Sequence, residues 1–276
     1  MNSSQAQVVR YRPPAAGPVP AWRDILGLPI AMTDYDEAMD RMDAMIAGRE
    51  RGYVCALATH AVSLSLHDHE LRSAIRYSTL ALPDGVPLVW AANTLGEGLP
   101  SRVYGPELMR RYNDRCAEQG HRIWLYGGHD QGSLVQLALN LRRMHGGLRI
   151  VGGYSPPFRA LSGEEEDAIV QQINDARPDV LWVGIGAPKQ EKWMARMRDR
   201  LEVPVMGGVG AAFDFHAGRV SQAPNWMQEA GLEWIYRIAQ EPRRLLPRYL
   251  IHNPRFMAAF LRQMARERRS ADEPAH

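Results

Sequence analysis

The carboxylate best placed for acid–base chemistry in this sequence is Asp84. It follows the apolar run Leu80–Leu82 after a single proline and precedes Gly85. A carboxylate where a strand gives way to a turn can act as a general base towards an incoming hydroxyl group. The alternative is a turn residue or a helix cap, because Asp-Gly pairs are common in both.

A second cluster of polar residues follows a glycine turn at Gly186. Lys189 could neutralise a phosphate group, and Gln190 could form a hydrogen bond with a sugar hydroxyl. The competing interpretation is a helix start, with Pro188 near the first turn and Glu191 favoured by the helix dipole.

Two glycine-rich stretches could bring a ligand close to the backbone. The first, 127–132, begins with Gly127 and Gly128 and opens a predicted helix, so its amides could bind a diphosphate. The second contains Gly208 and Gly210 and is followed by Asp214. Structural glycines in tight turns explain both stretches almost as well.

Two apparent metal signals do not support a metal site. Asp34-Tyr35-Asp36 has the DxD form, but it precedes the first predicted helix, where capping explains it. The His67-Asp68-His69 run falls inside a predicted helix, where residues two apart do not share a face. We therefore expect no metal and no cofactor, so cationic side chains and backbone amides must stabilise a leaving diphosphate.

The pattern of apolar residues predicts repeated β-α units. Short apolar runs alternate with amphipathic segments from about Ile25, which indicates a Rossmann-like, mostly parallel sheet flanked by helices. The expected strands are Val54–Leu57, Leu80–Leu82, Arg122–Tyr126, Arg149–Val151, Val180–Gly184 and Val203–Met206. The expected helices are Asp36–Ile46, Ala61–Arg76, Pro106–Gln119, Ser133–Met144, Gly163–Ala176 and Lys189–Leu201, the fifth with a Ser162 and Glu165 capping box. The polar loops then share one crevice at the carboxyl ends of the strands.

Composition limits the possible partners and compartments. The chain has 276 residues and a formal net charge of +2, so no global charge favours nucleic acid. Cys55 and Cys116 form no CxxC pair, which is consistent with a reducing cytosol. No run of about 18 apolar residues predicts a membrane-spanning helix. We expect a flexible segment at 1–22, an α/β domain at 23–242 and a disordered tail at 270–276.

Residues 243–269 form a separate basic segment with eight arginines and one acid. The arginines alternate with large apolar residues at roughly helical spacing, which suits a helix lying on an anionic bilayer. The alternative is an ordinary amphipathic helix that caps the domain and exposes a basic face.

Seven motifs in this order resemble the bacterial WecG/TagA/CpsF glycosyltransferase family. The resemblance covers about Ile30 to Tyr249 and rests on Pro83–Pro87, Arg102–Glu107, Pro178–Glu191, Gly207–Gly210, Phe213–Gly218, Ala223–Trp226 and Gly231–Trp234. It implies an inverting, metal-independent enzyme that moves a sugar from a UDP-sugar to a polyprenyl-diphosphate-linked sugar. The expected linkage is β, in bacterial exopolysaccharide or cell-surface polysaccharide biosynthesis.

The resemblance also implies roles for particular residues. Asp84 is the expected general base, with Arg102 and Gln190 beside it in the pocket. The expected substrate-binding residues are Thr59, Gly127, Gly128, Lys189, Glu191, Gly208, Gly210, Asp214, Arg237 and Arg243. The family's C-terminal appendage is thought to bring arginines over the active site at the membrane, so we expect a peripheral enzyme on the cytoplasmic face of the inner membrane.

Some alternatives remain open at this stage. Related sequences often have asparagine two residues after the first-loop threonine, whereas this chain reads Thr59-His60-Ala61, so donors of the glucose or N-acetylmannosamine type are both considered. A nucleotide-dependent oxidoreductase would need glycines in this loop, and a non-catalytic nucleotide- or lipid-binding module is the other rival. A homo-oligomer is possible if residues 243–269 pack on a neighbouring subunit.

Overall fold

The computed structural model describes residues 19–224, 226–227 and 233–272. Residues 1–18 of the predicted flexible segment lie outside this part, and a strand already begins at Trp22. Residues 273–276 of the predicted disordered tail also lie outside it. The final helix continues through residues 270–272, where that tail was expected to begin.

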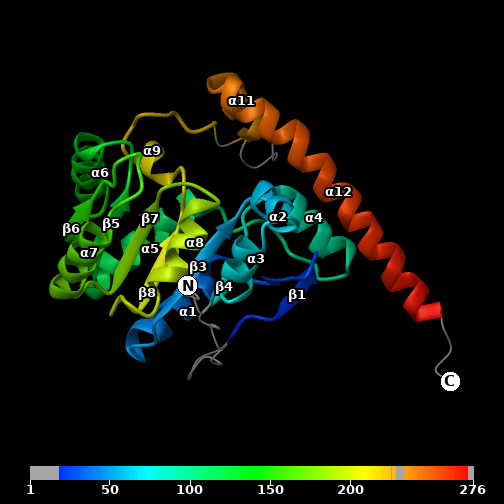
Figure 1. Cartoon of the computed structure of the whole chain (residues 1–276), viewed down its shortest axis with the longest axis horizontal. Helices are drawn as coiled ribbons and strands as arrows, with labels where there is room; N and C mark the ends of the chain where they lie inside the picture. The colour runs from blue at the N-terminus through cyan, green and yellow to red at the C-terminus, as the bar shows by residue number, and fades with distance from the viewer. Residues whose placement is uncertain (1–18, 225, 228–232, 273–276) are drawn as a thin grey trace, which may run out of the picture.

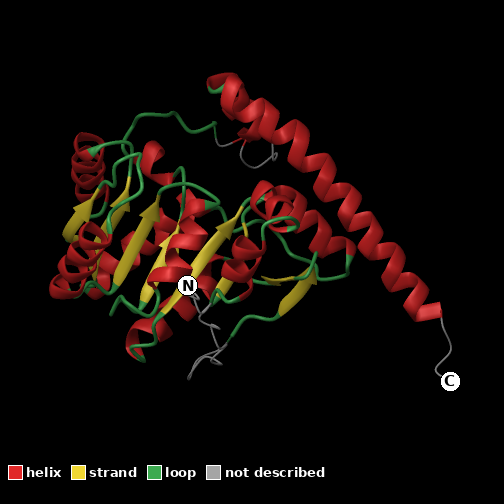
Figure 2. Ribbon diagram, in the orientation of Figure 1, coloured by secondary structure: helices red, strands yellow, loops and turns green. Residues whose placement is uncertain are grey.

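A six-stranded sheet forms the centre of the molecule, and all of its strand pairs are parallel. Its strands are β3 (Gly52–Leu57), β4 (Leu80–Pro83), β5 (Arg122–Gly127), β6 (Arg149–Tyr154), β7 (Val180–Gly184) and β8 (Val205–Gly208), in the spatial order β4-β3-β8-β7-β5-β6. Figure 2 shows these strands side by side with helices around them. The predicted Rossmann-like α/β fold is therefore confirmed.

Alternation of apolar side chains explains why the sheet is covered on both faces. Along β7, Val180 and Trp182 point into one core layer, while Leu181 and Val183 point into the other. Strands that are apolar on both faces must be covered by helices on both faces. The result is a three-layer α/β/α domain.

Helices provide the two outer layers. One layer contains α1 (Tyr35–Ala47), α5 (Gly105–Gln119), α6 (Gln131–Met144) and α9 (Ala212–His216). The other contains α2 (Thr59–Ser65), α3 (His69–Arg76), α4 (Val86–Thr94), α7 (Gly163–Ala176) and α8 (Lys189–Met197). Two further helices follow near the C-terminus: α11 (Glu233–Gln240) and α12 (Pro242–Asp272).

The single helix expected over Ala61–Arg76 is wrong. The structure has two helices there, and the break falls in the His67-Asp68-His69 run. The second helix, α3, begins here because the Asp68 carboxylate caps it, accepting a hydrogen bond from the Leu71 amide at 3.0 Å. Sequence periodicity alone missed this cap, and it also missed α4, α9 and α11.

Other predicted helix starts are confirmed. Asp34 caps α1 by accepting a hydrogen bond from the Glu37 amide at 3.0 Å, which supports capping as the role of the DxD sequence. Ser162 and Glu165 form the expected reciprocal capping box at the start of α7.

A small hairpin and the last helix close one side of the domain. Strands β1 (Trp22–Ile25) and β2 (Leu28–Ala31) pair antiparallel, and the Gln263 side chain on α12 bonds to the backbone of their turn. Phe256 and Phe260 are fully buried, and the rings of Phe260 and Trp90 of α4 lie 5.6 Å apart. Figure 1 shows α12 running across α2 and α4, with its end extending beyond the body.

Candidate active site

A cleft of about 1000 Å³ opens at the carboxyl edge of the sheet. Loops after all six parallel strands contribute to its lining, as expected for an open α/β sheet. The residues contributed by these loops include Ala58 after β3, Asp84 after β4, Gly128 and His129 after β5, Pro156–Leu161 after β6, Ile185–Ala187 and Lys189 after β7, and Val209–Ala211 after β8. The shared crevice predicted from the loop composition is therefore present.

Asp84 lies at the cleft within a small network of charged and aromatic side chains. Its Oδ1 atom is 3.9 Å from Nη1 of Arg102, and Arg102 also forms a close ion pair with Glu233. Glu233 also accepts a hydrogen bond from the Tyr104 hydroxyl at 2.5 Å. The Arg102 guanidinium lies over the Tyr104 ring, 4.2 Å from its centroid. Arg102 is thus held between two carboxylates, which fixes its position beside Asp84.

Burial strongly affects the acidity of Asp84. Loss of contact with water raises its pKa to about 6, because the ionised form loses hydration. Arg102 opposes this shift, whereas the negative charge of Glu233 adds to it. A carboxylate with a pKa near 6 is ionised at neutral pH and is a stronger base than an ordinary aspartate.

The alternative role of Asp84 as the cap of the following helix does not fit its contacts. Gly85 is the residue before α4, and that helix start has no side-chain cap. Asp84 instead accepts a long hydrogen bond, 3.4 Å, from the Gly105 amide at the start of α5. Its other oxygen faces Arg102, so the carboxylate remains at the cleft.

The cluster at the start of α8 divides between the cleft and the core. Lys189 is exposed and lines the cleft, whereas Gln190 lines it with only 2% of its surface exposed. Glu191 is fully buried behind Gln190 and accepts a hydrogen bond from the Gln190 amide nitrogen at 3.0 Å.

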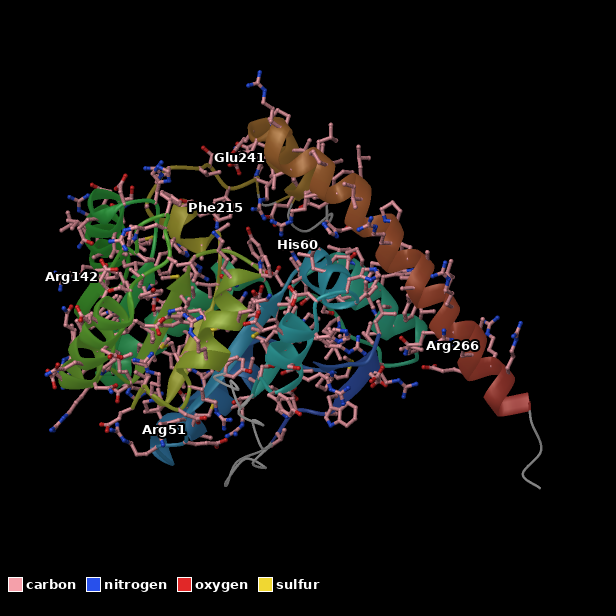
Figure 3. All side chains as sticks on the ribbon, viewed as in Figure 1. Arg51, His60, Arg142, Phe215, Glu241 and Arg266 are labelled. Carbon is pink, nitrogen blue, oxygen red and sulfur yellow. The ribbon has the colours of Figure 1, made fainter. Side chains whose placement is uncertain are left out.

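The C-terminal helices bring basic side chains to the same cleft. Arg237 of α11 and Arg248 of α12 both line it, and Arg237 also packs over the Phe215 ring at 5.4 Å. Arg248 donates a hydrogen bond to His60 Nδ1 at 2.5 Å. Figure 3 shows His60 and Phe215 on the side of the body that faces these helices. Residues of α11 and α12 thus form one side of the cleft.

The His60 imidazole is neutral in this environment. Burial and the nearby Arg248 charge lower its pKa to about 2. Neutral imidazole has one acceptor nitrogen, and the contact with Arg248 assigns that role to Nδ1. His60 therefore helps to hold Arg248 at the cleft without adding positive charge.

The remaining predicted site residues fall into three groups. Gly128, Gly210 and Asp214 line the cleft. Thr59, Gly127 and Gly208 do not line it; a Cβ on Gly127 would lie 2.5 Å from the Gly184 carbonyl oxygen, so this glycine permits a close contact between strand ends. Arg243 is exposed and is not part of the lining.

Several lining residues were not selected from the sequence. They include His60, Tyr104, Arg248 and the loop 156–161; Glu233, which binds Arg102 without lining the cleft, was not selected either. Tyr104 and Glu233 lie inside the resembling motifs, and Arg248 was counted in the basic segment. The motifs thus included some of these residues, but which side chains contact one another depended on the fold.

Within residues 19–224, 226–227 and 233–272, no group of three or more His, Cys, Asp or Glu side chains is arranged to hold a metal ion. The cations that line the cleft are instead lysine and arginine: Lys189, Arg159, Arg196, Arg237 and Arg248.

The parallel sheet, the cleft at its carboxyl edge and the half-buried carboxylate beside it are the arrangement of a Rossmann-like α/β enzyme. The sequence profile of the "Glycosyl transferase WecG/TagA/CpsF family" matches residues 23–270, which include nearly all of α12. The chain belongs to this family and is a glycosyltransferase.

Curated relatives have consistent names. The chain is 25% identical over 221 residues to the N-acetylglucosaminyldiphosphoundecaprenol N-acetyl-beta-D-mannosaminyltransferase of Bacillus subtilis, covering 80% of this chain and 84% of that protein. A protein of the same name from Staphylococcus aureus is 26% identical over 229 residues, covering 80% of this chain and 86% of that protein. The Bacillus spizizenii protein of this name is 28% identical over 190 residues, covering 69% and 70%.

Proposed function

We propose that this chain is an inverting glycosyltransferase that uses no metal ion and moves a sugar from a UDP-sugar to a polyprenyl-diphosphate-linked sugar. The observation that carries the proposal is the Asp84 carboxylate, which lies at the cleft beside Arg102 and has a pKa raised to about 6. The names of the relatives, which specify a diphosphoundecaprenol-linked acceptor, support the same class of acceptor here.

The reaction is a single displacement at the anomeric carbon. Asp84 takes the proton of the acceptor hydroxyl as the acceptor oxygen forms a bond to C1 of the donor sugar. The bond between C1 and the diphosphate oxygen breaks on the opposite face, and its electron pair leaves with UDP. Attack from the face opposite the leaving group inverts the anomeric carbon, which gives the β linkage from an α-linked donor.

Positive side chains at the cleft take up the charge of the departing diphosphate. Arg237 and Arg248 come from the C-terminal helices, and Lys189 comes from the start of α8. Preorganised cations and amides at the site where charge develops stabilise the transition state. This arrangement supports the proposal that the enzyme works without a metal ion.

The first crevice loop supports a donor that differs from that of the N-acetylmannosaminyl relatives. Position 61, where the family resemblance leads us to expect asparagine, is a buried alanine, and the adjacent His60 is bound to Arg248. Glucose and N-acetylmannosamine donors are therefore both tested, in exopolysaccharide or surface-polysaccharide assembly.

A transfer assay tests the function directly. Radiolabelled UDP-glucose, UDP-N-acetylmannosamine and other UDP-sugars are supplied with a short-chain polyprenyl-diphosphate-sugar acceptor in EDTA. We expect β-linked transfer from one donor, and this transfer should survive chelation. Loss of transfer in EDTA that Mg²⁺ restores would contradict the metal-free mechanism, and absence of transfer from every donor would favour a non-catalytic binding module.

We also propose that the outer surface of α11 and α12 binds the cytoplasmic face of the membrane. Arg255, Arg262 and Arg266 are exposed and spaced by seven and four residues, so they share one side of α12. Exposed apolar side chains also occur on α11 and on α12: Trp234, Ile235, Leu246, Leu250, Ile251 and Leu261. Figure 3 labels Arg266 far along α12, away from the cleft.

This combination of charge and exposed apolar area is typical of a helix at a bilayer surface. The described helices include none that is long and apolar enough to span a membrane. The proposal is therefore peripheral attachment at the leaflet that carries the lipid-linked acceptor.

Neutralising the basic stripe should weaken membrane attachment. Each arginine near an anionic surface contributes about 1 kcal/mol, so the triple variant Arg255→Gln, Arg262→Gln, Arg266→Gln should bind anionic vesicles at least about tenfold more weakly. Sedimentation with vesicles containing phosphatidylglycerol, at low and high salt, measures the change.

The matched control replaces three exposed arginines outside α12, Arg76→Gln, Arg142→Gln and Arg143→Gln, which changes the net charge equally. Its vesicle binding should remain close to wild type. Equal losses in the two triple variants would indicate a net-charge effect and contradict a specific membrane surface on α12.

A further inference from the structure

Gln190 and Glu191 form a buried polar pair at the edge of the cleft. Gln190 is 2% exposed, and Glu191 is completely buried. The Gln190 Nε2 atom donates a hydrogen bond to Glu191 Oε1 at 3.0 Å. Because the amide nitrogen is directed at Glu191, the carbonyl oxygen is the atom left to meet a ligand.

That carbonyl oxygen has no hydrogen-bond partner among the described residues. It lies on the side of Gly210, which lines the cleft; a Cβ placed on Gly210 would be 3.6 Å from it. A buried amide oxygen without a partner is costly in free energy unless a ligand or water supplies a donor. Since Gln190 lines the cleft, a bound substrate can supply that donor.

The glycines of the 207–210 loop make room for this amide. A Cβ on Gly208 would be 3.3 Å from Gln190 Nε2 and 2.6 Å from the Met194 Cε atom. The absent side chains therefore accommodate Gln190 at the end of β8. This differs from the direct contact between loop backbone and ligand that the glycine pattern suggested for Gly208.

Burying the Glu191 carboxyl group at this position costs folding free energy. Its Oε2 atom has no hydrogen-bond partner among the described residues, while its Oε1 atom accepts the bond from Gln190. Burial raises its pKa to about 7, although the charge of Arg248 opposes the shift. A methionine of similar size would fill this space without a desolvated carboxyl group. Stability therefore does not explain why an acid stands here.

We propose that Glu191 is a positioning residue that holds the Gln190 amide with its oxygen facing the cleft, where it accepts a hydrogen bond from a hydroxyl or acetamido N–H group of a bound sugar. The inference rests on the proposed function for the presence of a sugar substrate. In this inference Gln190 accepts a hydrogen bond from the sugar, and Glu191 fixes the orientation of the Gln190 amide.

The test compares two replacements of Glu191. Glu191→Met keeps the volume but cannot accept the hydrogen bond, whereas Glu191→Gln retains an oxygen that can accept it. Calorimetry measures the Kd of UDP, of the UDP-sugar and of a short-chain polyprenyl-diphosphate-sugar. KM values for the donor and the acceptor are measured in the same preparations, and thermal unfolding gives the Tm.

In Glu191→Met, at least one sugar-bearing substrate should bind about three- to tenfold more weakly, the range expected for one neutral hydrogen bond. The Kd of UDP should stay within about twofold, and the Tm should be equal to or higher than that of wild type. Glu191→Gln should restore sugar binding. The substrate whose Kd and KM change identifies which sugar Gln190 contacts.

Three results would overturn the inference. The first is unchanged binding of every ligand in Glu191→Met. The second is a loss of sugar binding in Glu191→Gln equal to that in Glu191→Met. The third is a parallel loss of UDP affinity and Tm in Glu191→Met, which would indicate a structural role. The exposed variant Glu118→Met serves as the control for loss of one acid. Because the binding measurements need no turnover, failure of wild-type transfer would contradict the proposed function without obscuring this result.

Discussion

Asp84→Asn is expected to reduce kcat for sugar transfer by about 10²- to 10⁴-fold, the range that general-base catalysis contributes. Asparagine has almost the same shape and can still accept the hydrogen bond that the Gly105 amide donates to Asp84. It cannot, however, take the proton of the acceptor hydroxyl. Transfer with the best donor measures the loss, and the Kd of UDP should change little.

The pH dependence should identify the same group. Asp84 must be ionised to act as a base, and its pKa is raised to about 6. We expect kcat/KM to rise between pH 5 and pH 7 with a midpoint near 6, because kcat/KM reports groups of the free enzyme. This rise should disappear from the residual activity of Asp84→Asn.

As the pH rises from about 4 to 6, the Asp84 contribution to the stability of the fold should fall, whereas activity should rise. The unfolded chain ionises an ordinary aspartate near pH 3.8, whereas the folded chain holds the Asp84 proton up to about pH 6. Folded protein therefore binds more protons in this window, and Asp84 lowers stability as pH rises through it. At pH 7.5 Asp84→Asn should have a Tm equal to or above that of wild type. A lower Tm with lost UDP binding would indicate a structural role for Asp84.

The fold was largely predictable because its strands carry a simple signal. Most of the six parallel strands contain a short apolar run, and each expected strand overlaps an observed one. The break between α2 and α3 was not predictable from periodicity, because the apolar spacing continues past it. Only the cap formed by Asp68 marks the start of α3, and capping is a local hydrogen bond rather than a periodic pattern.

The candidate site was partly predictable for a different reason. Asp84 lies in the loop after β4, and Lys189 and Gln190 begin the helix that follows β7, so their placement at the carboxyl edge followed from the topology. Pairings between distant segments did not follow. Glu233 meets Arg102 from 131 positions away, and Arg248 meets His60 from 188 positions away. Spacing within a motif cannot reveal such contacts, because they depend on how α11 and α12 return to the sheet.

Replacing both arginines that the C-terminal helices bring to the cleft should have the second large effect. In Arg237→Gln, Arg248→Gln, we expect kcat/KM to fall at least about a hundredfold, since each charge-assisted contact to phosphate contributes about 1.5–3 kcal/mol. Both side chains line the cleft, where UDP gains negative charge as it leaves. Calorimetry with UDP should show a parallel loss of affinity. Arg143→Gln, an exposed change on α6, serves as the control.

The single variants indicate whether the two arginines act on one group. If Arg237 and Arg248 contact the same diphosphate, their separate losses should not add, and the double-mutant cycle should give a coupling energy clearly different from zero. Unchanged UDP affinity in the double variant would contradict their proposed role. Loss of vesicle binding in the same variant would instead assign these arginines to the membrane surface, because the stripe of Arg255, Arg262 and Arg266 is expected to retain that function. Suppose that the Arg237 and Arg248 variant loses only UDP affinity and the Arg255, Arg262 and Arg266 variant loses only vesicle binding. One end of α12 would then complete the active site, while its outer surface would hold the enzyme at the membrane that carries the lipid-linked acceptor.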